Sequence, residues 1–129
     1  MKLTVVYDNR SLYPHLSPGW GFSCLVGENL LFDTGADADK LLSNMGQMGL
    51  DIKGIRAVVL SHAHGDHTGG LESILAVNKG TTVYLPHSFP TSLKAQVKAN
   101  ASLVEVREPM EITEGIYTTG EMGRGIHEQ

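Results

Sequence analysis

The sequence lacks several features that would place it outside the ordinary cytoplasmic proteins. Its single cysteine has no partner for a disulfide within the chain, which fits a reducing compartment. No apolar run approaches the roughly 20 residues that a membrane-spanning helix needs. The N-terminal stretch from Met1 to Asp8 is too short and too soon charged for a signal peptide, and we expect a strand there. The net charge of -4 disfavours nucleic acid as a partner, because phosphates require a basic surface. We therefore expect a cytoplasmic protein that binds neither membrane nor nucleic acid.

What remains is the composition of a small globular protein. The chain has 129 residues, of which 41% are hydrophobic and 19% are charged. This length supports one domain with a moderate core but not two domains. We expect residues 1–129 to form a single domain.

Strand and helix patterns alternate along the chain. Helices are expected over 71–77 and 91–100, and a further one begins at a cap by Asp37 and ends at Gly46 or Gly49. Runs rich in β-branched and apolar residues predict strands over 2–7, 22–26, 30–32, 55–60, 81–85, 103–106 and 116–118. This order predicts an α/β fold with helices packed on a sheet. The run at 55–60 does not alternate with polar residues, which predicts cover on both of its faces.

The densest group of reactive side chains directly follows the strand expected at 55–60. His62, His64, Asp66 and His67 place three imidazoles and one carboxylate within six residues. These groups are typical ligands of zinc, and they also suit iron and manganese. Residues i and i+2 of an extended segment point the same way, so His62 and His64 can reach one ion. Asp66 and His67 then face a second ion from the turn that follows.

Two such ions give a hydrolytic site. Ions roughly 3.5–4 Å apart share a water molecule and lower its pKa towards ~7. The expected reaction is attack by metal-bound hydroxide on an ester, thioester, amide or phosphoester of a small-molecule substrate. Packing alone does not explain three histidines and an aspartate interleaved with glycines at this spacing.

Two segments resemble the metallo-β-lactamase superfamily. His62-Ala63-His64-Gly65-Asp66-His67 matches its H-x-H-x-D-H motif, and Leu31-Phe32-Asp33-Thr34-Gly35 resembles an earlier strand-end motif. The resemblance implies two zinc ions in a complete site, with Asp66 as a metal ligand and proton acceptor. It implies that Asp33 supports the ligand loop instead of binding metal. The implied fold is half of an αβ/βα sandwich, with a mixed sheet and helices on one face.

Shorter segments at 20–23, 68–71 and 117–121 are similar to the subgroup that contains dihydropterin-aminobenzene-phosphate synthase. That similarity implies an alternative to hydrolysis, namely transfer chemistry in which a metal polarises a phosphate-bearing substrate. Flavin-linked reduction on the same fold ranks last, because the sequence shows no flavin-binding segment.

The sequence departs from the family pattern after the motif. Complete members carry a third histidine, a bridging aspartate and a last histidine further on, but no aspartate follows Asp66 here. The only later histidines are His87 and His127, and neither is expected to bind metal; His15 is expected to be exposed. We therefore expect residues 1–129 to correspond to the N-terminal half of the fold and to be weakly active or inactive alone. The alternative is a non-catalytic half-domain that binds metal or a partner.

A half fold is also expected to leave an apolar surface uncovered. The sheet face that meets the second half in complete members is expected to be apolar and open, which favours association. The expected partners are a second copy of the chain or a separate second-half polypeptide.

Overall fold

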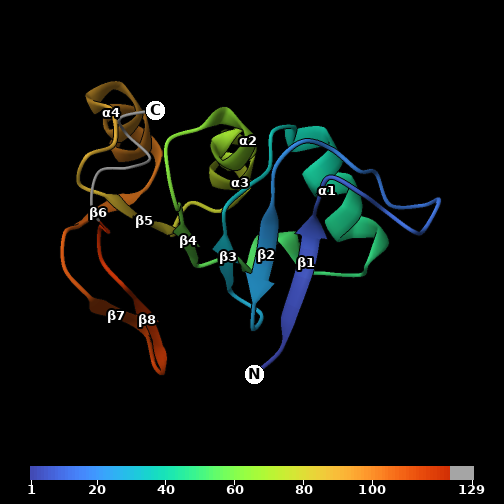
Figure 1. Ribbon diagram of the computed structural model, residues 1–129, viewed down its shortest axis with the longest axis horizontal. Coiled ribbons are helices and arrows are strands. Elements are labelled where there is room, and N and C mark those ends of the chain that lie inside the picture. Colours follow the sequence, from blue (N-terminus) through green and yellow to red (C-terminus); the bar gives the residue numbers. More distant parts are fainter. Residues whose placement is uncertain (123–129) are drawn as a thin grey trace.

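The computed structural model describes residues 1–122, which form a six-stranded mixed sheet, a separate hairpin and helices (Figure 1). The strands of the sheet are β1 (Leu3–Tyr7), β2 (Ser23–Val26), β3 (Leu30–Phe32), β4 (Ala57–Val59), β5 (Thr82–Pro86) and β6 (Ser102–Val106). The hairpin consists of β7 (Met110–Thr113) and β8 (Ile116–Thr118). The helices are α1 (Ala38–Gln47), α2 (Gly65–Thr68), α3 (Leu71–Val77) and α4 (Thr91–Asn100), with a 3₁₀ turn at Ile52–Gly54. None of these helices is long and apolar enough to cross a membrane.

The pairing of the strands changes once across the sheet, from antiparallel to parallel, and this change positions the site. Its order is β1-β2-β3-β4-β5-β6, with antiparallel pairs from β1 to β3 and parallel pairs from β3 to β6. The expected α/β fold with a mixed sheet is therefore confirmed. Because β3 and β4 are parallel neighbours, the residues that leave their carboxyl ends lie side by side.

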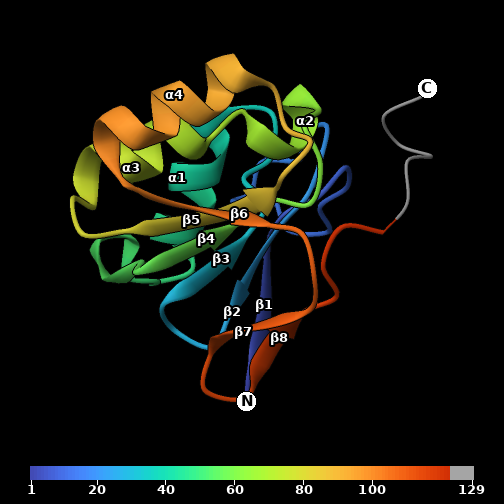
Figure 2. The same ribbon diagram turned by 90° about the vertical axis from the view of Figure 1, so that its left-hand side faces the viewer.

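Helices cover one face of the sheet (Figure 2). Leu31, Val58 and Val83 occupy one row across β3, β4 and β5, and all three are fully buried. Burial of each such aliphatic side chain contributes about 1.5–3 kcal/mol to the free energy of unfolding. On the helix side, the fully buried Leu41 of α1 and Ile74 of α3 belong to the same core cluster.

Helix α1 begins and ends as its sequence predicts. The Asp37 carboxylate accepts a hydrogen bond from the Lys40 backbone N–H at 3.1 Å, so Asp37 is the N-cap. Leu41 and Met45, four residues apart, turn the same face of the helix to the core. Of the two expected helix ends, Gly49 is correct, because it takes the left-handed conformation at φ 70° just after the helix.

The strands differ from the prediction in two details. The strand expected at 55–60 is shorter, and the cover on its second face is incomplete, because Ala57 is buried there but Val59 is half-buried. Strand β7 of the hairpin was not predicted, because its alternation of half-buried and exposed residues extends over only four residues. His127 lies outside the described residues.

The sheet face opposite the helices is apolar and partly open. Leu3 and Val5 on β1 are 66% and 49% exposed, although both are aliphatic side chains in a strand. Phe32, Val59 and Tyr84 lie farther along this face and are half-buried. β1 is also an edge strand in the described sheet, with one neighbour, β2. An open apolar face beside an edge strand favours association.

We expect the chain to self-associate through this face. The substitution Val5→Lys should weaken association at least about tenfold, because an aliphatic contact worth roughly 1.5–3 kcal/mol is replaced by a charge. Sedimentation velocity over a range of concentrations measures this change. The control is Leu12→Lys, since Leu12 is 93% exposed in the loop between β1 and β2. A wild-type chain that stays monomeric throughout the range would contradict the prediction.

Candidate metal centre

The candidate site forms where β3 and β4 end side by side. Phe32 and Val59 pair in register, so the next residues of the two strands, Asp33 and Leu60, leave the sheet together. The Asp33 backbone N–H donates to the Val59 carbonyl at 2.8 Å and continues the strand pairing by one step. Asp33 then takes a positive φ of 54°, the only non-glycine residue to do so among those described. This turn aims its carboxylate at the segment that follows β4.

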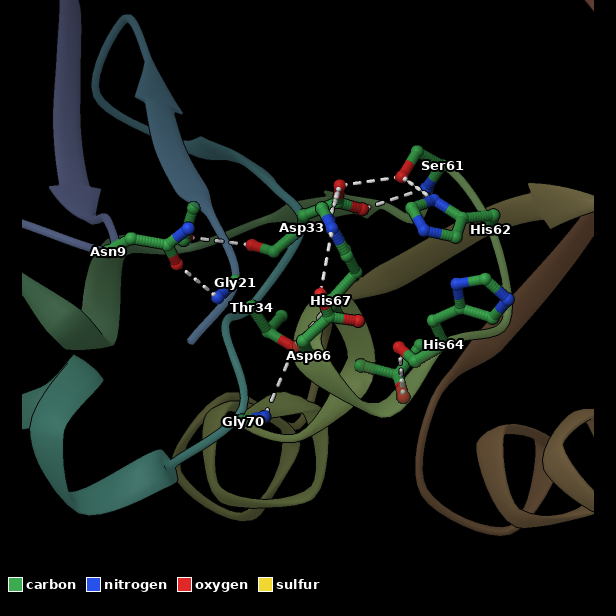
Figure 3. A network of polar contacts seen from close by, with 12 residues as sticks. Asn9, Gly21, Asp33, Thr34, Ser61, His62, His64, Asp66, His67 and Gly70 are labelled. Atoms are coloured by element: carbon green, nitrogen blue, oxygen red, sulfur yellow. Dashed lines mark hydrogen bonds and ion pairs between the residues drawn. The ribbon is translucent and has the colours of Figure 1, made fainter. Parts of the chain in front are cut away.

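The Asp33 carboxylate is the hub of the site (Figure 3). It is 1% exposed and accepts three hydrogen bonds. Ser61 donates two of them, from its backbone N–H to Oδ1 at 2.8 Å and from its hydroxyl to Oδ2 at 2.6 Å. The third comes from His67 Nδ1, 2.7 Å from Oδ2. Because both oxygens already serve as acceptors inside the protein, Asp33 is better suited to hold other ligands than to bind an ion itself.

These hydrogen bonds set the tautomers of two histidines. A carboxylate only accepts, so His67 Nδ1 donates to Asp33, and in the neutral form of this ring the lone pair is on Nε2. The Ser61 hydroxyl donates its proton to Asp33 and therefore accepts from His62 Nδ1, 2.8 Å away. In the neutral form of His62 the lone pair is then also on Nε2. The hydrogen-bond network thus assigns Nε2 as the metal-binding atom of both rings.

The side chains of the motif lie close together. The ring of His62 lies 4.6 Å from that of His64 and 4.2 Å from that of His67, centroid to centroid. His67 Nε2 is 3.6 Å from an Asp66 carboxylate oxygen. Ligand atoms of His62, His64 and Asp66 lie within 4.8 Å of one another, as do those of Asp33, His62 and His67. His62 therefore stands at the centre of the cluster, a role that its sequence position alone did not show.

The environment of His62 favours its metal-binding form. Burial lowers the pKa of its imidazole below the ordinary value, and the neighbouring imidazoles of His67 and His64 lower the pKa further. The carboxylates of Asp33 and Asp66 act in the opposite direction but are outweighed. His62 is therefore neutral at pH 7, as a metal ligand must be.

The turn that carries the ligands is held by close backbone packing against the segment after β3. The Thr34 backbone N–H and hydroxyl both donate to the His67 carbonyl, at 2.7 and 2.9 Å. Gly69 approaches so closely that a Cβ there would lie 2.1 Å from the Ala36 carbonyl oxygen. A Cβ on Gly70 would lie 2.6 Å from the Thr34 carbonyl oxygen. The Gly-Gly pair is therefore a packing requirement of the site.

Thr34 and Ser61 are the residues that sequence reasoning missed. Neither is a metal ligand, and each was noted only as part of a motif. A serine directly before a histidine-rich turn, and a threonine directly after a buried aspartate, were the available signals. Their partners are 28 and 33 residues away in the chain, so only the fold reveals the contacts.

The remaining described histidines lie outside the cluster. His87 Nδ1 is 2.8 Å from a Glu105 carboxylate oxygen, which Lys94 also contacts at 2.8 Å. The hydrogen bond from Lys94, together with the one from His87, holds the pKa of Glu105 at about 2. His15 is exposed in the loop between β1 and β2, with its ring 6.0 Å from that of Tyr13.

A cavity of about 390 Å³ opens beside His62. It lies along the open face of the sheet, with Phe32, Val59 and Tyr84 among its walls, and residues 118–122 close one side. The walls are mainly apolar; the polar residues are Ser61 and His62 at the metal-site end and Thr118, Thr119 and Glu121 in the segment 118–122. A mainly apolar space with a few polar groups is typical of small-molecule sites.

We expect Asp33→Asn to weaken both the fold and metal binding. Both carboxylate oxygens of Asp33 accept hydrogen bonds in the wild-type protein. The side-chain NH₂ group of an asparagine at position 33 would therefore face a donor in either orientation. One unsatisfied buried contact costs about 1–3 kcal/mol in the free energy of unfolding, and loss of an outer support of this kind weakens metal affinity about 10–100-fold. Chemical denaturation and zinc titration measure the two effects.

Asp37→Asn is the matched control, since asparagine caps a helix as well as aspartate does. Equal effects of the two substitutions would show that Asp33 has no special role.

Known proteins support a family assignment on both sequence and fold. Residues 22–129 match the family model described as the metallo-beta-lactamase superfamily. A curated relative is the 7,8-dihydropterin-6-methyl-4-(beta-D-ribofuranosyl)-aminobenzene-5'-phosphate synthase of Methanocaldococcus jannaschii, which is 32% identical over 75% of this chain. The chain covers 40% of that protein. The resemblance inferred from the motifs is thus confirmed.

Solved structures share the fold at lower identity. The metallo-beta-lactamase fold protein YhfI from Bacillus subtilis aligns with a TM-score of 0.60 and 18% identity, over 84% of this chain and 48% of its own. A putative metallo-beta-lactamase from Thermotoga maritima aligns with a TM-score of 0.56 and 15% identity, over 88% of this chain and 62% of its own. The chain therefore spans about two-fifths of the curated relative's length and roughly half of these structures. On the match of its residues 22–129, the protein belongs to the metallo-β-lactamase superfamily.

Proposed function

We propose that the protein belongs to the metal-dependent hydrolases of its superfamily and acts on an ester, thioester, amide or phosphoester. The observation that carries the proposal is the convergence of three imidazoles and one carboxylate at the strand ends. In two of the imidazoles Nδ1 is engaged by Asp33 or Ser61, which leaves Nε2 as the nitrogen for a metal ion. A structural histidine does not need its second nitrogen kept free.

The donor set fits a pair of zinc ions, and iron or manganese would accept the same groups. His62 and His64 would hold one ion, and Asp66 and His67 would hold the other. Asp33 would remain a support. Zinc usually takes three protein ligands, so further donors from a partner or from another part of the protein would complete the site.

Bound ions would activate water as a nucleophile and polarise the carbonyl or phosphoryl group under attack. The chain's own residues would orient the reactants. Asp66 would accept the proton of the attacking water, since its carboxylate is about a quarter exposed and therefore reachable from solvent. The apolar cavity beside His62 would receive the non-reacting part of a small-molecule substrate.

A second candidate is transfer chemistry of the pterin-synthase kind. It is favoured by the 32% identity to the Methanocaldococcus jannaschii synthase. In such a reaction the amine nitrogen of an arylamine would form a bond to the 6-methylene carbon of a dihydropterin, a leaving group would depart from that carbon, and the nitrogen would lose a proton. The same metal site would then neutralise charge on the phosphate-bearing groups.

Metal content tests the proposal first. We expect the wild-type protein to take up close to two zinc ions per chain, and His64→Ala to lose about tenfold or more in affinity for at least one of them. Elemental analysis after dialysis and calorimetric titration provide the measurements. His15→Ala is the control, because His15 is exposed and outside the cluster. A wild-type protein without bound metal would support a non-catalytic half-domain.

Turnover in ¹⁸O-labelled water separates hydrolysis from transfer. With p-nitrophenyl acetate and bis(p-nitrophenyl) phosphate, the zinc-loaded protein should release product that carries one ¹⁸O atom, detected by mass spectrometry. With an arylamine ribofuranosyl phosphate and an activated 6-methyl dihydropterin, transfer would instead give a condensed product without ¹⁸O. If the metal-loaded protein forms neither product, both activities are rejected for this chain on its own.

A further inference from the structure

The loop between β1 and β2 reaches the metal site and contacts it through a glycine (Figure 3). Gly21 has a φ of 114°, a conformation that residues with a side chain rarely adopt. An added Cβ would lie 1.7 Å from the Asp66 carbonyl oxygen and 3.1 Å from the Asp66 Cβ. No side chain fits between this loop and Asp66. Because residue 21 is a glycine, the backbone of the loop can contact the backbone of Asp66.

The same loop is anchored on both sides of this contact. Asn9 Oδ1 accepts a hydrogen bond from the Gly21 backbone N–H at 2.9 Å. Upstream, the Ser17 backbone N–H donates to Asn44 Oδ1 at 2.7 Å, which ties the loop to α1. A Cβ on Gly19 would lie 2.3 Å from the hydroxyl of the buried Tyr7. These contacts hold the loop in place beside Asp66.

Asp66 has few other restraints of this kind. It lies in the first turn of the four-residue helix α2, which has no side-chain cap. The carbonyl of the following His67 is held by Thr34, but the Asp66 carbonyl meets Gly21. A methyl group at position 21 would also press on the Asp66 Cβ, and displacing the Cβ moves the carboxylate. The position of the loop and the orientation of the carboxylate are thus coupled through one contact.

We propose that Gly21 is a positioning residue that fixes the orientation of Asp66 toward the second metal ion. This inference rests on the proposed metal-dependent function and deepens it. It predicts that a single methyl group at position 21 changes the metal coordination while leaving the sheet intact. Asn9 acts in the same direction, because its side chain holds the Gly21 amide in place.

Cobalt(II) is the probe for the test, because its visible absorption bands report the ligand set. Gly21→Ala should weaken the binding of one Co²⁺ ion about tenfold or more and alter the absorption spectrum of the loaded protein. Gly27→Ala is the matched control. Gly27 also has a positive φ, 68°, but no atom lies within 4 Å of an added Cβ. It therefore tests a positive φ, though a less strained one than that of Gly21, without the contact to Asp66.

A second pair of variants tests the inference even if the Gly21→Ala protein does not fold. Asn9→Ala removes the acceptor for the Gly21 amide and should shift the cobalt spectrum in the same direction, whereas Asn9→Asp keeps an acceptor and should preserve it. Trp20, the only tryptophan and 74% exposed, provides a reporter beside Gly21. Its emission should change on Co²⁺ binding in wild type and Asn9→Asp but less in Asn9→Ala.

The outcomes separate this inference from the proposed function. Identical cobalt affinity and spectra in Gly21→Ala and Gly27→Ala would overturn the role of Gly21 and leave the hydrolase proposal standing. If Gly21→Ala does not fold, an unchanged spectrum in Asn9→Ala would overturn it instead. Normal metal binding without turnover in wild type would reject the hydrolase and leave the role of Gly21 intact. A wild-type chain that binds no cobalt would overturn both.

Discussion

The buried Asp33 carboxylate is the interaction on which the site depends. It joins the ends of two parallel strands through Ser61 and reaches into the ligand turn through His67. Removing a carboxylate from water is costly unless its oxygens accept hydrogen bonds, and here three donors meet them. The network exists only when β3 and β4 are in register and the turn is closed. Assembly of the site is therefore coupled to the folding of the sheet.

Backbone contacts complete the site without contributing a ligand. Gly21, Gly69 and Gly70 each lie where a Cβ would overlap backbone atoms of a neighbouring segment. The ligand turn is thus enclosed by the segment after β3 on one side and by the β1–β2 loop on the other. Metal sites need ligands held to within a fraction of an ångström, and close backbone packing achieves this more firmly than flexible side chains do. The open apolar cavity beside His62 then gives a substrate access to the cluster.

The sequence predicted the ligands better than their supports. Short-range patterns were sufficient for α1, α3 and α4, and for the family, because spacing within a few residues determines caps, helix faces and the H-x-H-x-D-H turn. Asp33 was assigned its supporting role through the family resemblance. The contacts of Ser61 and Gly21 could not be predicted, since their partners are 28 and 45 residues away and depend on strand register. Hairpin strand β7 was missed because its alternating pattern is only four residues long.

The central claim is that the Asp33–Ser61 network presents Nε2 of two histidines to a metal ion. Long-range ¹⁵N–¹H NMR of the imidazole rings in the metal-free protein, followed through a pH titration until both rings are neutral, tests this claim most directly. The account predicts that the neutral rings of His62 and His67 each carry the proton on Nδ1 and leave Nε2 unprotonated. A neutral ring with the proton on Nε2 and a free Nδ1, at either position, would contradict it.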